Sequence, residues 1–340
     1  MFNCANGTLH LDTMQFSEHR AEDMLTKKSE VSFDPEARCE RWEQFVSQIM
    51  ENDPERIKFL QKALGYGLSG DTRYECMFFL YGATTRNGKG TLCESVLRVL
   101  GDYGITARPE TISLKPNSGG SSPSEDIARL AGVRFVNISE PGKGLVLNAA
   151  QLKSMTGNDT INARFLHENS FDFRPQFKLY INTNYLPVVT DLTLFNSGRV
   201  ICLPFDRHFS EEEQDKGLKA EFAQPENQSA ILNWLIEGFR LLREEGLTAP
   251  EAVARSTESY RLESDKTAQF IAECMTKDPS AIERTSEVYA RYKAWCADNG
   301  FKCESAKNFK QSLAVFGSVE RRRVKGCEKN SVFCGYSLNK

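Results

Sequence analysis

The most constraining stretch of the sequence runs from Met77 to Leu100 and reads MFFLYGATTRNGKGTLCESVLRVL. It begins with an apolar run of strand length, carries glycines around Lys89, and ends with apolar residues at helical spacing. Strand, glycine-rich loop and helix in this order are typical of a nucleoside triphosphate site, because loop N–H groups, the helix N-terminus and the lysine all face the phosphates. A glycine-containing turn without a ligand is the alternative.

The loop differs from the simplest phosphate-loop pattern in two ways. Five residues separate Gly82 from Gly88, and Gly90 stands where a magnesium-binding Ser or Thr is usual. Thr91 is therefore the hydroxyl available to Mg²⁺, either directly or through a water molecule. We predict that ATP is held by Gly82, Thr85, Arg86, Asn87, Gly88, Lys89, Gly90 and Thr91.

The composition excludes several classes of protein. No apolar run of the 340 residues approaches the ~20 needed to span a bilayer, and the N-terminus lacks the apolar core of a secretory signal. We therefore expect a cytosolic protein without a membrane partner. The ten cysteines form no Cys-x-x-Cys pair, which favours free thiols over zinc ligands or disulfides. With a net charge of −3, any surface for nucleic acid must be local.

Further candidates for nucleotide chemistry follow strands downstream of the loop. Glu140 ends the strand predicted over 133–138, where a carboxylate can orient the attacking water and help hold Mg²⁺; a solvated loop acid is the alternative. Asn182 and Asn184 end the strand KLYINTN, and either amide can sense a γ-phosphate or simply form a turn. Arg199 opens the strand VICLPF, where a guanidinium needs an anionic partner.

The chain divides by pattern into four segments. We predict an N-terminal helical region over 1–70, the nucleotide-binding core over 71–245, a linker over 246–264 and a C-terminal domain over 265–340. Helices near 268–275, 286–297 and 305–316, followed by two strands, are typical of a winged helix.

A local excess of positive charge marks the C-terminal domain. Between Lys302 and Lys329, eight Lys or Arg stand against three Glu, a local charge of +5 that favours contacts with nucleic-acid phosphates over a merely solvated face. The candidate DNA contacts here are Arg321, Arg322, Arg323 and Lys325.

Four motifs, in order and with matching spacing, resemble the C-terminal helicase part of phage and plasmid primase-helicases, a branch of the superfamily 3 helicases. They are GATTRNGKGT, RFVNISE, TGNDTINARF with FDFRPQFKLYINTNYLP, and GRVICLPF. The resemblance covers most of the chain. It implies an α/β, AAA+-like P-loop NTPase core with an N-terminal helical region and a C-terminal winged-helix domain. It also implies a ring, usually a hexamer, that hydrolyses ATP and moves along single-stranded DNA.

The resemblance also assigns roles to residues. Lys89 and Thr91 belong to the first motif, Glu140 to the second, and Asn184 is the polar sensor. Arg199 matches the arginine that completes a neighbouring subunit's site, although Gly198 stands where the family often has a second arginine.

The family's pore hairpin resembles the segment from Arg164 to Phe173. Arg164 and His167 are its candidate DNA contacts, and Lys143 faces either DNA or a neighbour's ATP.

We therefore expect an ATP- and Mg-dependent DNA helicase module of a phage or plasmid replication protein, acting in the bacterial cytosol on single-stranded DNA and origin duplex. A primase or polymerase is a further expected partner. Because no primase domain is evident, it was lost, lies on another chain, or the sequence is a fragment. The first alternative is a DNA-binding initiator that uses ATP as an assembly switch with little unwinding. The second is a monomeric metabolic kinase, against which Arg199 and the basic tail argue.

Overall fold

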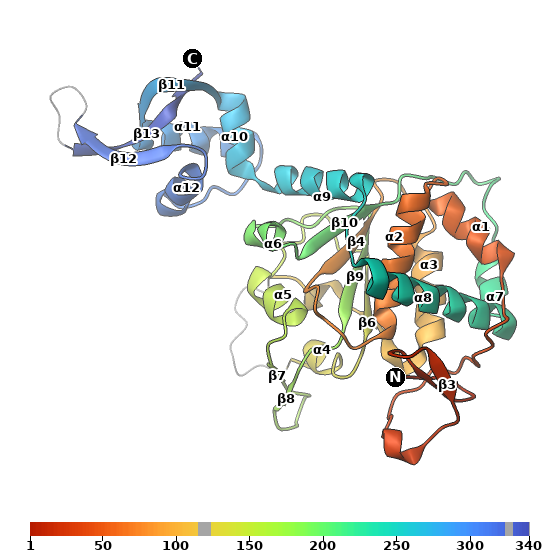
Figure 1. Cartoon of the computed structure of the whole chain (residues 1–340). Helices are drawn as coiled ribbons and strands as arrows, with labels where there is room; N and C mark the ends of the chain where they lie inside the picture. Colours follow the sequence, from red (N-terminus) through yellow and green to blue (C-terminus); the bar gives the residue numbers. More distant parts are fainter. Residues whose placement is uncertain (115–123, 324–328, 340) are drawn as a thin grey trace. The chain divides into compact units, whose positions relative to one another are not determined.

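The computed structural model describes residues 1–114, 124–323 and 329–339. The chain divides into two compact units, Met1–Tyr260 and Arg261–Lys340 (Figure 1). The first unit holds both the expected N-terminal region and the expected nucleotide-binding core. Within the described ranges, none of the helices combines the length and apolarity that a membrane span requires.

A five-stranded parallel sheet is the centre of the first unit, with strand order β10-β4-β9-β6-β5. Because all pairs are parallel, the carboxyl ends of the strands lie at one edge, where sites of such folds form. The strands are β4 (Met77–Tyr81), β5 (Gly104–Ala107), β6 (Phe135–Ser139), β9 (Lys178–Thr183) and β10 (Val200–Pro204). This arrangement agrees with the predicted α/β P-loop core.

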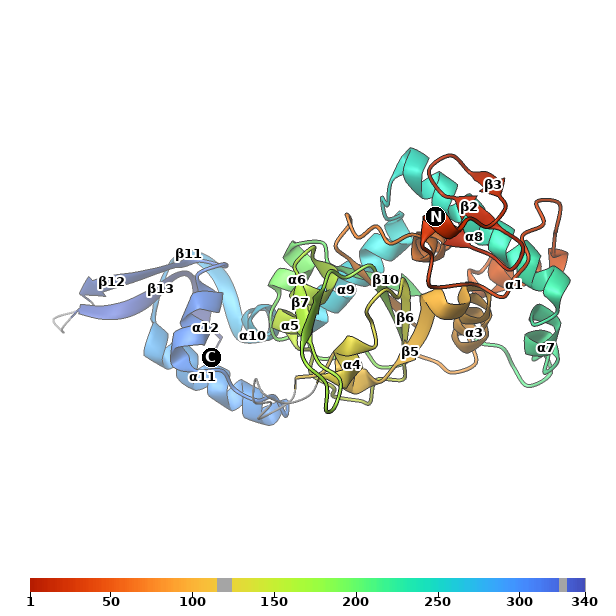
Figure 2. The same cartoon turned by 90° about the horizontal axis from the view of Figure 1, so that it is seen from below.

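Both faces of the sheet are buried, as parallel strands require. Along β4, Phe78 and Leu80 pack into one core while Met77 and Phe79 pack into the other. Figures 1 and 2 show helices on both sides. Residues of the first core come from α1 (Glu40–Ile49), α2 (Pro54–Gly65), α3 (Lys89–Leu100), α7 (Leu218–Phe222) and α8 (Pro225–Glu245). Those of the second come from α4 (Glu125–Ala128), α5 (Ala149–Thr156), α6 (Thr193–Asn196) and α9 (Glu251–Ser264).

Short elements complete the first unit. The N-terminal region is not only helical, because β1 (Phe2–Asn3), β2 (Thr8–His10) and β3 (Gln15–Ser17) form an antiparallel sheet ahead of α1. The predicted hairpin is present as β7 (Ile161–Ala163) paired with β8 (Phe171–Phe173). The 3₁₀ helices are η1 (Ala21–Asp23), η2 (Tyr66–Leu68), η3 (Gly101–Tyr103) and η4 (Pro109–Thr111).

Residues 246–264, expected to be a linker, contain helix α9. Val253 and Tyr260 of this helix are buried, and the Tyr260 hydroxyl donates to the Pro187 carbonyl at 2.6 Å. Most residues of this stretch are polar, as in a linker. Two buried side chains, those of Val253 and Tyr260, nevertheless attach it to the core.

The second unit alternates helices and strands. They are α10 (Lys266–Cys274), β11 (Met275–Arg284), α11 (Thr285–Asp298), α12 (Ala306–Leu313), β12 (Ser318–Arg323) and β13 (Lys329–Leu338). The strands form an antiparallel sheet in the order β11-β13-β12. The sequence did not indicate β11, because it contains Pro279 and its register shifts between Asp278 and Ile282.

Candidate functional site

The glycine-rich loop connects the end of β4 to the start of α3, as the sequence predicts. Helix α3 begins at Lys89, and Gly88 before it has a φ of +82°, a conformation that favours glycine. A Cβ atom at Gly88 would lie 2.5 Å from Ile49 Cγ2, so helix α1 packs directly on the loop. At Gly90 a Cβ would meet no described atom within 4 Å, so packing does not explain that glycine.

Lys89 is buried inside the loop, with 3% of its surface exposed. Its Nζ donates a hydrogen bond to Asn87 Oδ1 at 2.8 Å. Burial lowers the pKa of the Lys89 ammonium to about 8, and the nearby Cys93 and Glu140 oppose that shift. The lysine is therefore an incompletely solvated cation whose charge a phosphate would stabilise.

Two asparagine amides hold the carbonyl groups of the loop. Asn87 Nδ2 donates to the Thr84 carbonyl at 2.7 Å, and Asn184 Nδ2 donates to the Gly82 carbonyl at 2.6 Å and to Thr84 as well. Asn184 is thus the asparagine of the KLYINTN strand whose amide bonds to the loop, while Asn182 is buried in β9. The Gly82 N–H donates to the Thr183 carbonyl at 3.3 Å, so an anion would have to bind N–H groups later in the loop.

Glu140 follows β6 at the same edge of the sheet. Its φ is +53°, its N–H donates to the Asn182 carbonyl at 2.9 Å, and its side chain is exposed. Lys143 lies nearby, with Nζ 5.9 Å from the centre of the exposed Tyr185 ring. The carboxyl ends of β4, β6 and β9 therefore gather a buried cation, an exposed carboxylate and an amide.

The structure adds a segment that the sequence interpretation missed, residues 205–209 after β10. The Phe205 carbonyl accepts from Asn87 Nδ2 at 3.4 Å, and His208 Nδ1 lies 2.8 Å from the Thr85 carbonyl. The Phe209 N–H donates to the Arg86 carbonyl at 2.9 Å. Polar residues directly after the strand VICLP were the available signal, because parallel strands end at the same edge.

A metal ion bound at this site would have few protein ligands. The described ranges contain no group of three or more His, Cys, Asp or Glu side chains that could hold a metal ion. Mg²⁺ at a phosphate loop takes most of its ligands from phosphates and water. Thr91, in the first turn of α3, and Glu140 fit that chemistry as a hydroxyl and a carboxylate.

Arg199 lies at the opposite edge of the sheet from Lys89. Its carbonyl accepts the Met77 N–H at 2.8 Å, at the amino ends of β10 and β4. Strand β4 has five residues, so at about 3.3 Å per residue the two edges are roughly 16 Å apart. Arg199 therefore cannot reach a nucleotide at Lys89 of the same molecule.

The anionic partner that the sequence required for Arg199 is Glu75. Arg199 Nη2 lies 2.7 Å from Glu75 Oε2, and Nη1 donates to Thr156 Oγ1 at 2.9 Å. The arginine side chain is 16% exposed and the Glu75 side chain 40% exposed. Solvent therefore reaches the pair mainly through the Glu75 carboxylate, while the guanidinium is largely buried.

The predicted DNA contacts lie in both units. Arg164 follows β7, and His167 has a φ of +64° at the exposed hairpin tip. In the second unit Arg321 and Arg322 are both exposed, and Arg322 also pairs with Glu320 at 2.7 Å.

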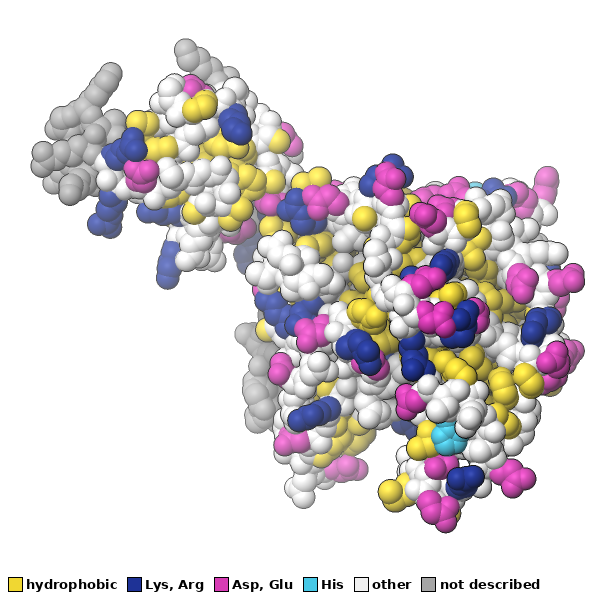
Figure 3. Space-filling model, viewed as in Figure 1, with side chains coloured by type: hydrophobic (Ala, Val, Ile, Leu, Met, Phe, Trp, Pro, Cys, Tyr) yellow, Lys and Arg dark blue, Asp and Glu magenta, His cyan; other side chains and the backbone are white. Residues whose placement is uncertain are grey.

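Two further predicted contacts are less fully described. The side chain of Arg323, at the end of β12, and all of Lys325 lie outside the described residues. Among the charged side chains on the visible face of the second unit, dark-blue Lys and Arg are more frequent than magenta Asp and Glu, whereas both signs mix over the first (Figure 3).

Three family profiles match parts of the chain. One described as D5 N terminal like matches residues 1–51, a family of unknown function matches residues 80–194, and one described as Poxvirus D5 protein-like matches residues 262–333.

Two viral relatives are 28% identical to the chain, over 272 and 286 residues. They are provisionally named helicases, 022R of frog virus 3 (isolate Goorha) and L207/L206 of Acanthamoeba polyphaga mimivirus, and the matches cover 75% and 78% of this chain. The chain spans 28% and 29% of the length of these relatives.

Solved structures share the fold. The apo structure of the NrS-1 C-terminal region aligns with a TM-score of 0.53 and 10% identity, covering 90% of this chain and 78% of that one. The central parallel sheet is consistent with a P-loop-like core, and the two sequence relatives are provisionally named helicases. These matches support the resemblance to primase-helicases that the motifs showed.

Proposed function

We propose that the chain is an ATP-dependent DNA helicase module of a viral or plasmid replication protein, which translocates single-stranded DNA through a homo-oligomeric ring. The observation that carries this proposal is the position of Arg199, at the sheet edge opposite Lys89. An arginine that cannot serve its own site, and whose side chain is 16% exposed beside the more exposed Glu75, is suited to serve a neighbour's site, as an arginine finger acting in trans does.

In the proposed cycle each of these residues has a defined role. Lys89 and the loop N–H groups bind the phosphates, and Thr91 and Glu140 support Mg²⁺. Glu140 also orients the attacking water, while Asn184 links the γ-phosphate to the loop carbonyls it contacts. Arg199 of the neighbour stabilises charge on the transferring phosphoryl group. An AAA+-like hexamer is the assembly we favour, since every site would then have its finger.

The test is DNA-stimulated ATPase activity measured across protein concentration for the wild type, Arg199→Ala and Arg98→Ala. Arg98 is an exposed arginine of α3 and serves as the matched control. We expect the wild type and Arg98→Ala to gain specific activity with concentration and Arg199→Ala to lose nearly all of it, by about 10³-fold. A monomer with undiminished activity after Arg199→Ala would overturn the trans assignment.

A second candidate is a replication initiator that uses ATP as an assembly switch. The order of elements in the second unit, α10-β11-α11-α12-β12-β13, favours a winged helix, and the exposed Arg321 favours a contact with duplex DNA. Replacing hairpin residues 167–169 with glycine and serine distinguishes the two functions. The helicase loses unwinding while keeping its ATPase activity, whereas the initiator keeps origin binding and has little unwinding to lose.

A further inference from the structure

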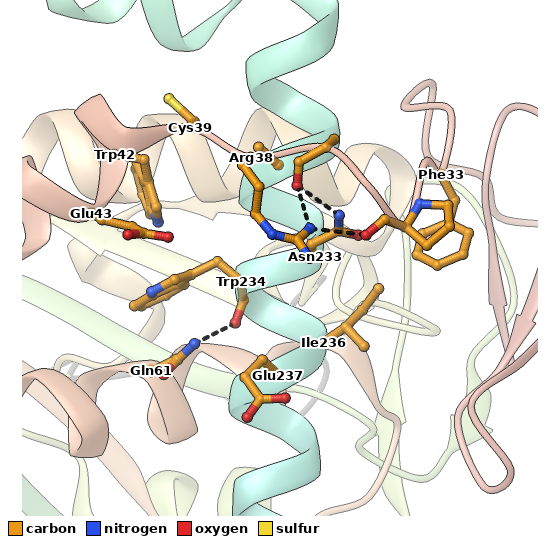
Figure 4. Close-up of a pocket in the computed structure, with 13 residues that line it drawn as sticks. Phe33, Arg38, Cys39, Trp42, Glu43, Gln61, Asn233, Trp234, Ile236 and Glu237 are labelled. Carbon is orange, nitrogen blue, oxygen red and sulfur yellow. Dashed lines mark hydrogen bonds between the residues drawn. The ribbon is translucent and has the colours of Figure 1, made fainter.

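A cavity of about 440 Å³ lies in the first unit among α1, α2, α8 and the segment that precedes α1. Its size is within the range of small-ligand sites. Two indole rings stand on one side, from Trp42 and Trp234, together with the Glu43 carboxylate and Gln61; Arg38, Asn233 and Phe33 stand on the other (Figure 4).

One buried polar atom of this wall has no partner. Trp42 is 1% exposed, and its Nε1 forms no hydrogen bond to any described residue. In Figure 4 the nitrogen edge of this ring faces the space between Glu43 and Trp234. A buried N–H without an acceptor costs about 1–3 kcal/mol, so the group is suited to an acceptor that a ligand brings.

The other polar groups around the cavity are mostly satisfied within the chain. Asn233 Nδ2 donates to the Asp34 and Ala37 carbonyls at 2.8 and 3.0 Å, and Gln61 Nε2 donates to the Trp234 carbonyl at 2.9 Å. Arg38 Nη1 donates to the Pro35 and Ala37 carbonyls. Glu43 is different, because this exposed carboxylate forms no ion pair within the described ranges.

The open groups specify complementary chemistry. An unsatisfied N–H needs a hydrogen-bond acceptor such as a carbonyl oxygen, an unpaired carboxylate favours a cation, and a half-buried indole face binds either an aliphatic stem or a cation. The Trp42 and Trp234 rings pack edge to face, with their centres 5.6 Å apart. In Figure 4 the Trp234 ring lies beside Glu43. Glu237 adds a second carboxylate, already paired with Arg240.

We propose that this cavity, defined by Trp42, Glu43 and Trp234, binds a basic side chain on an extended segment of a protein partner. The Lys or Arg side chain lies along the Trp234 face with its cationic end at Glu43. A main-chain carbonyl of the same segment accepts from Trp42 Nε1. The site is separate from the phosphate loop and does not depend on the proposed helicase activity.

The test uses the three tryptophans of the chain, Trp42, Trp234 and Trp295, each of which gives one indole N–H signal in a ¹⁵N-tryptophan NMR spectrum. The probe is the peptide acetyl-Gly-Arg-Gly-amide added to the full chain. We expect it to move the Trp42 and Trp234 signals. Trp295, whose Nε1 donates to Glu273 at 2.7 Å in the second unit, is the internal reference and should not move.

Variants and control peptides make the test decisive. Glu43→Gln should weaken binding of the arginine peptide about three- to fivefold, as loss of one partly exposed ion pair does. Glu40→Gln, the same change on an exposed residue of α1 outside the cavity, should leave binding unchanged. The proposal fails if the Trp42 signal is unmoved, if a norleucine peptide or ethylguanidinium alone binds as well, or if Glu43→Gln has no effect.

Discussion

The charge of Lys89 sets the pH range in which the loop can bind phosphate. Since burial lowers its pKa to about 8, the lysine is protonated below that pH and neutral above it in the nucleotide-free protein. Phosphates bind the protonated form, so the affinity for Mg-ADP should change little below pH 7 and fall about tenfold between pH 7 and pH 9. Equilibrium titration across this range measures the effect.

Lys89→Arg is the control for that prediction. A guanidinium remains charged throughout the range, so this variant should bind more weakly but with an affinity that does not change between pH 7.5 and pH 9. An equal loss of affinity in both proteins would assign the pH dependence to another group.

Asn184 provides a second prediction at the residue scale. Because its amide holds the Gly82 carbonyl, Asn184→Ala should loosen the loop itself and weaken Mg-ADP binding about three- to tenfold, the effect of one or two lost hydrogen bonds. A residue that senses only the γ-phosphate would instead lower the ATPase rate and leave ADP affinity intact. Comparing ADP affinity with the ATPase rate of this variant separates the two roles.

Some contacts of the candidate site could be predicted from the sequence, and others could not. The spacing of glycines around Lys89 predicts the loop and the start of α3, and the strand context of Arg199 predicts an anionic partner. The sequence does not indicate that Asn87 bonds to Phe205, 118 residues away, or that the partner of Arg199 is Glu75. Such pairs depend on which strands are neighbours in the sheet, and local patterns do not encode that order.

At the scale of elements, strand β12 presents its arginines unequally. Both arginines are exposed, but Arg322 is paired with Glu320 on one side of the strand, while Arg321 extends from the other side. If β12 contacts DNA, Arg321→Ala should weaken duplex binding more than Arg322→Ala and lower the salt dependence by about one phosphate contact. Binding isotherms at several salt concentrations measure both quantities, and equal effects of the two variants would contradict the prediction.

Elements with strong periodicity could be predicted, and those with weak periodicity could not. The three C-terminal helices occur close to their expected positions. Helix α9 and strand β11 were missed because each buries only a few side chains along a polar sequence. Burial by the rest of the fold, rather than local propensity, stabilises such elements.

At the scale of the whole molecule, the pair of Arg199 and Glu75 should influence assembly. In the proposed ring, a neighbour's γ-phosphate has to replace Glu75 as the partner of Arg199. Removing the competing charge with Glu75→Gln should therefore lower the protein concentration that gives half-maximal ATPase activity, by about threefold. The activity curve, recorded beside that of wild type, measures the shift.

Asp71→Asn is the matched control. Asp71 lies four residues before Glu75 and forms its ion pair with the exposed Arg73 instead of with Arg199. This variant should leave the curve unchanged. If Glu75→Gln instead abolishes activity as Arg199→Ala is expected to do, Glu75 orients the arginine and does not compete for it.

Helices α2 and α8 cross at Gly65 and Gly238 with their backbones in contact. A Cβ atom at Gly65 would lie 2.6 Å from the Leu235 carbonyl oxygen, so not even a methyl group fits between the helices. Surfaces this close cannot slide or tilt past each other without separating. We therefore expect α2 and α8 to move together as one rigid body in any rearrangement during a nucleotide cycle. A hinge for such a movement would lie elsewhere in the chain.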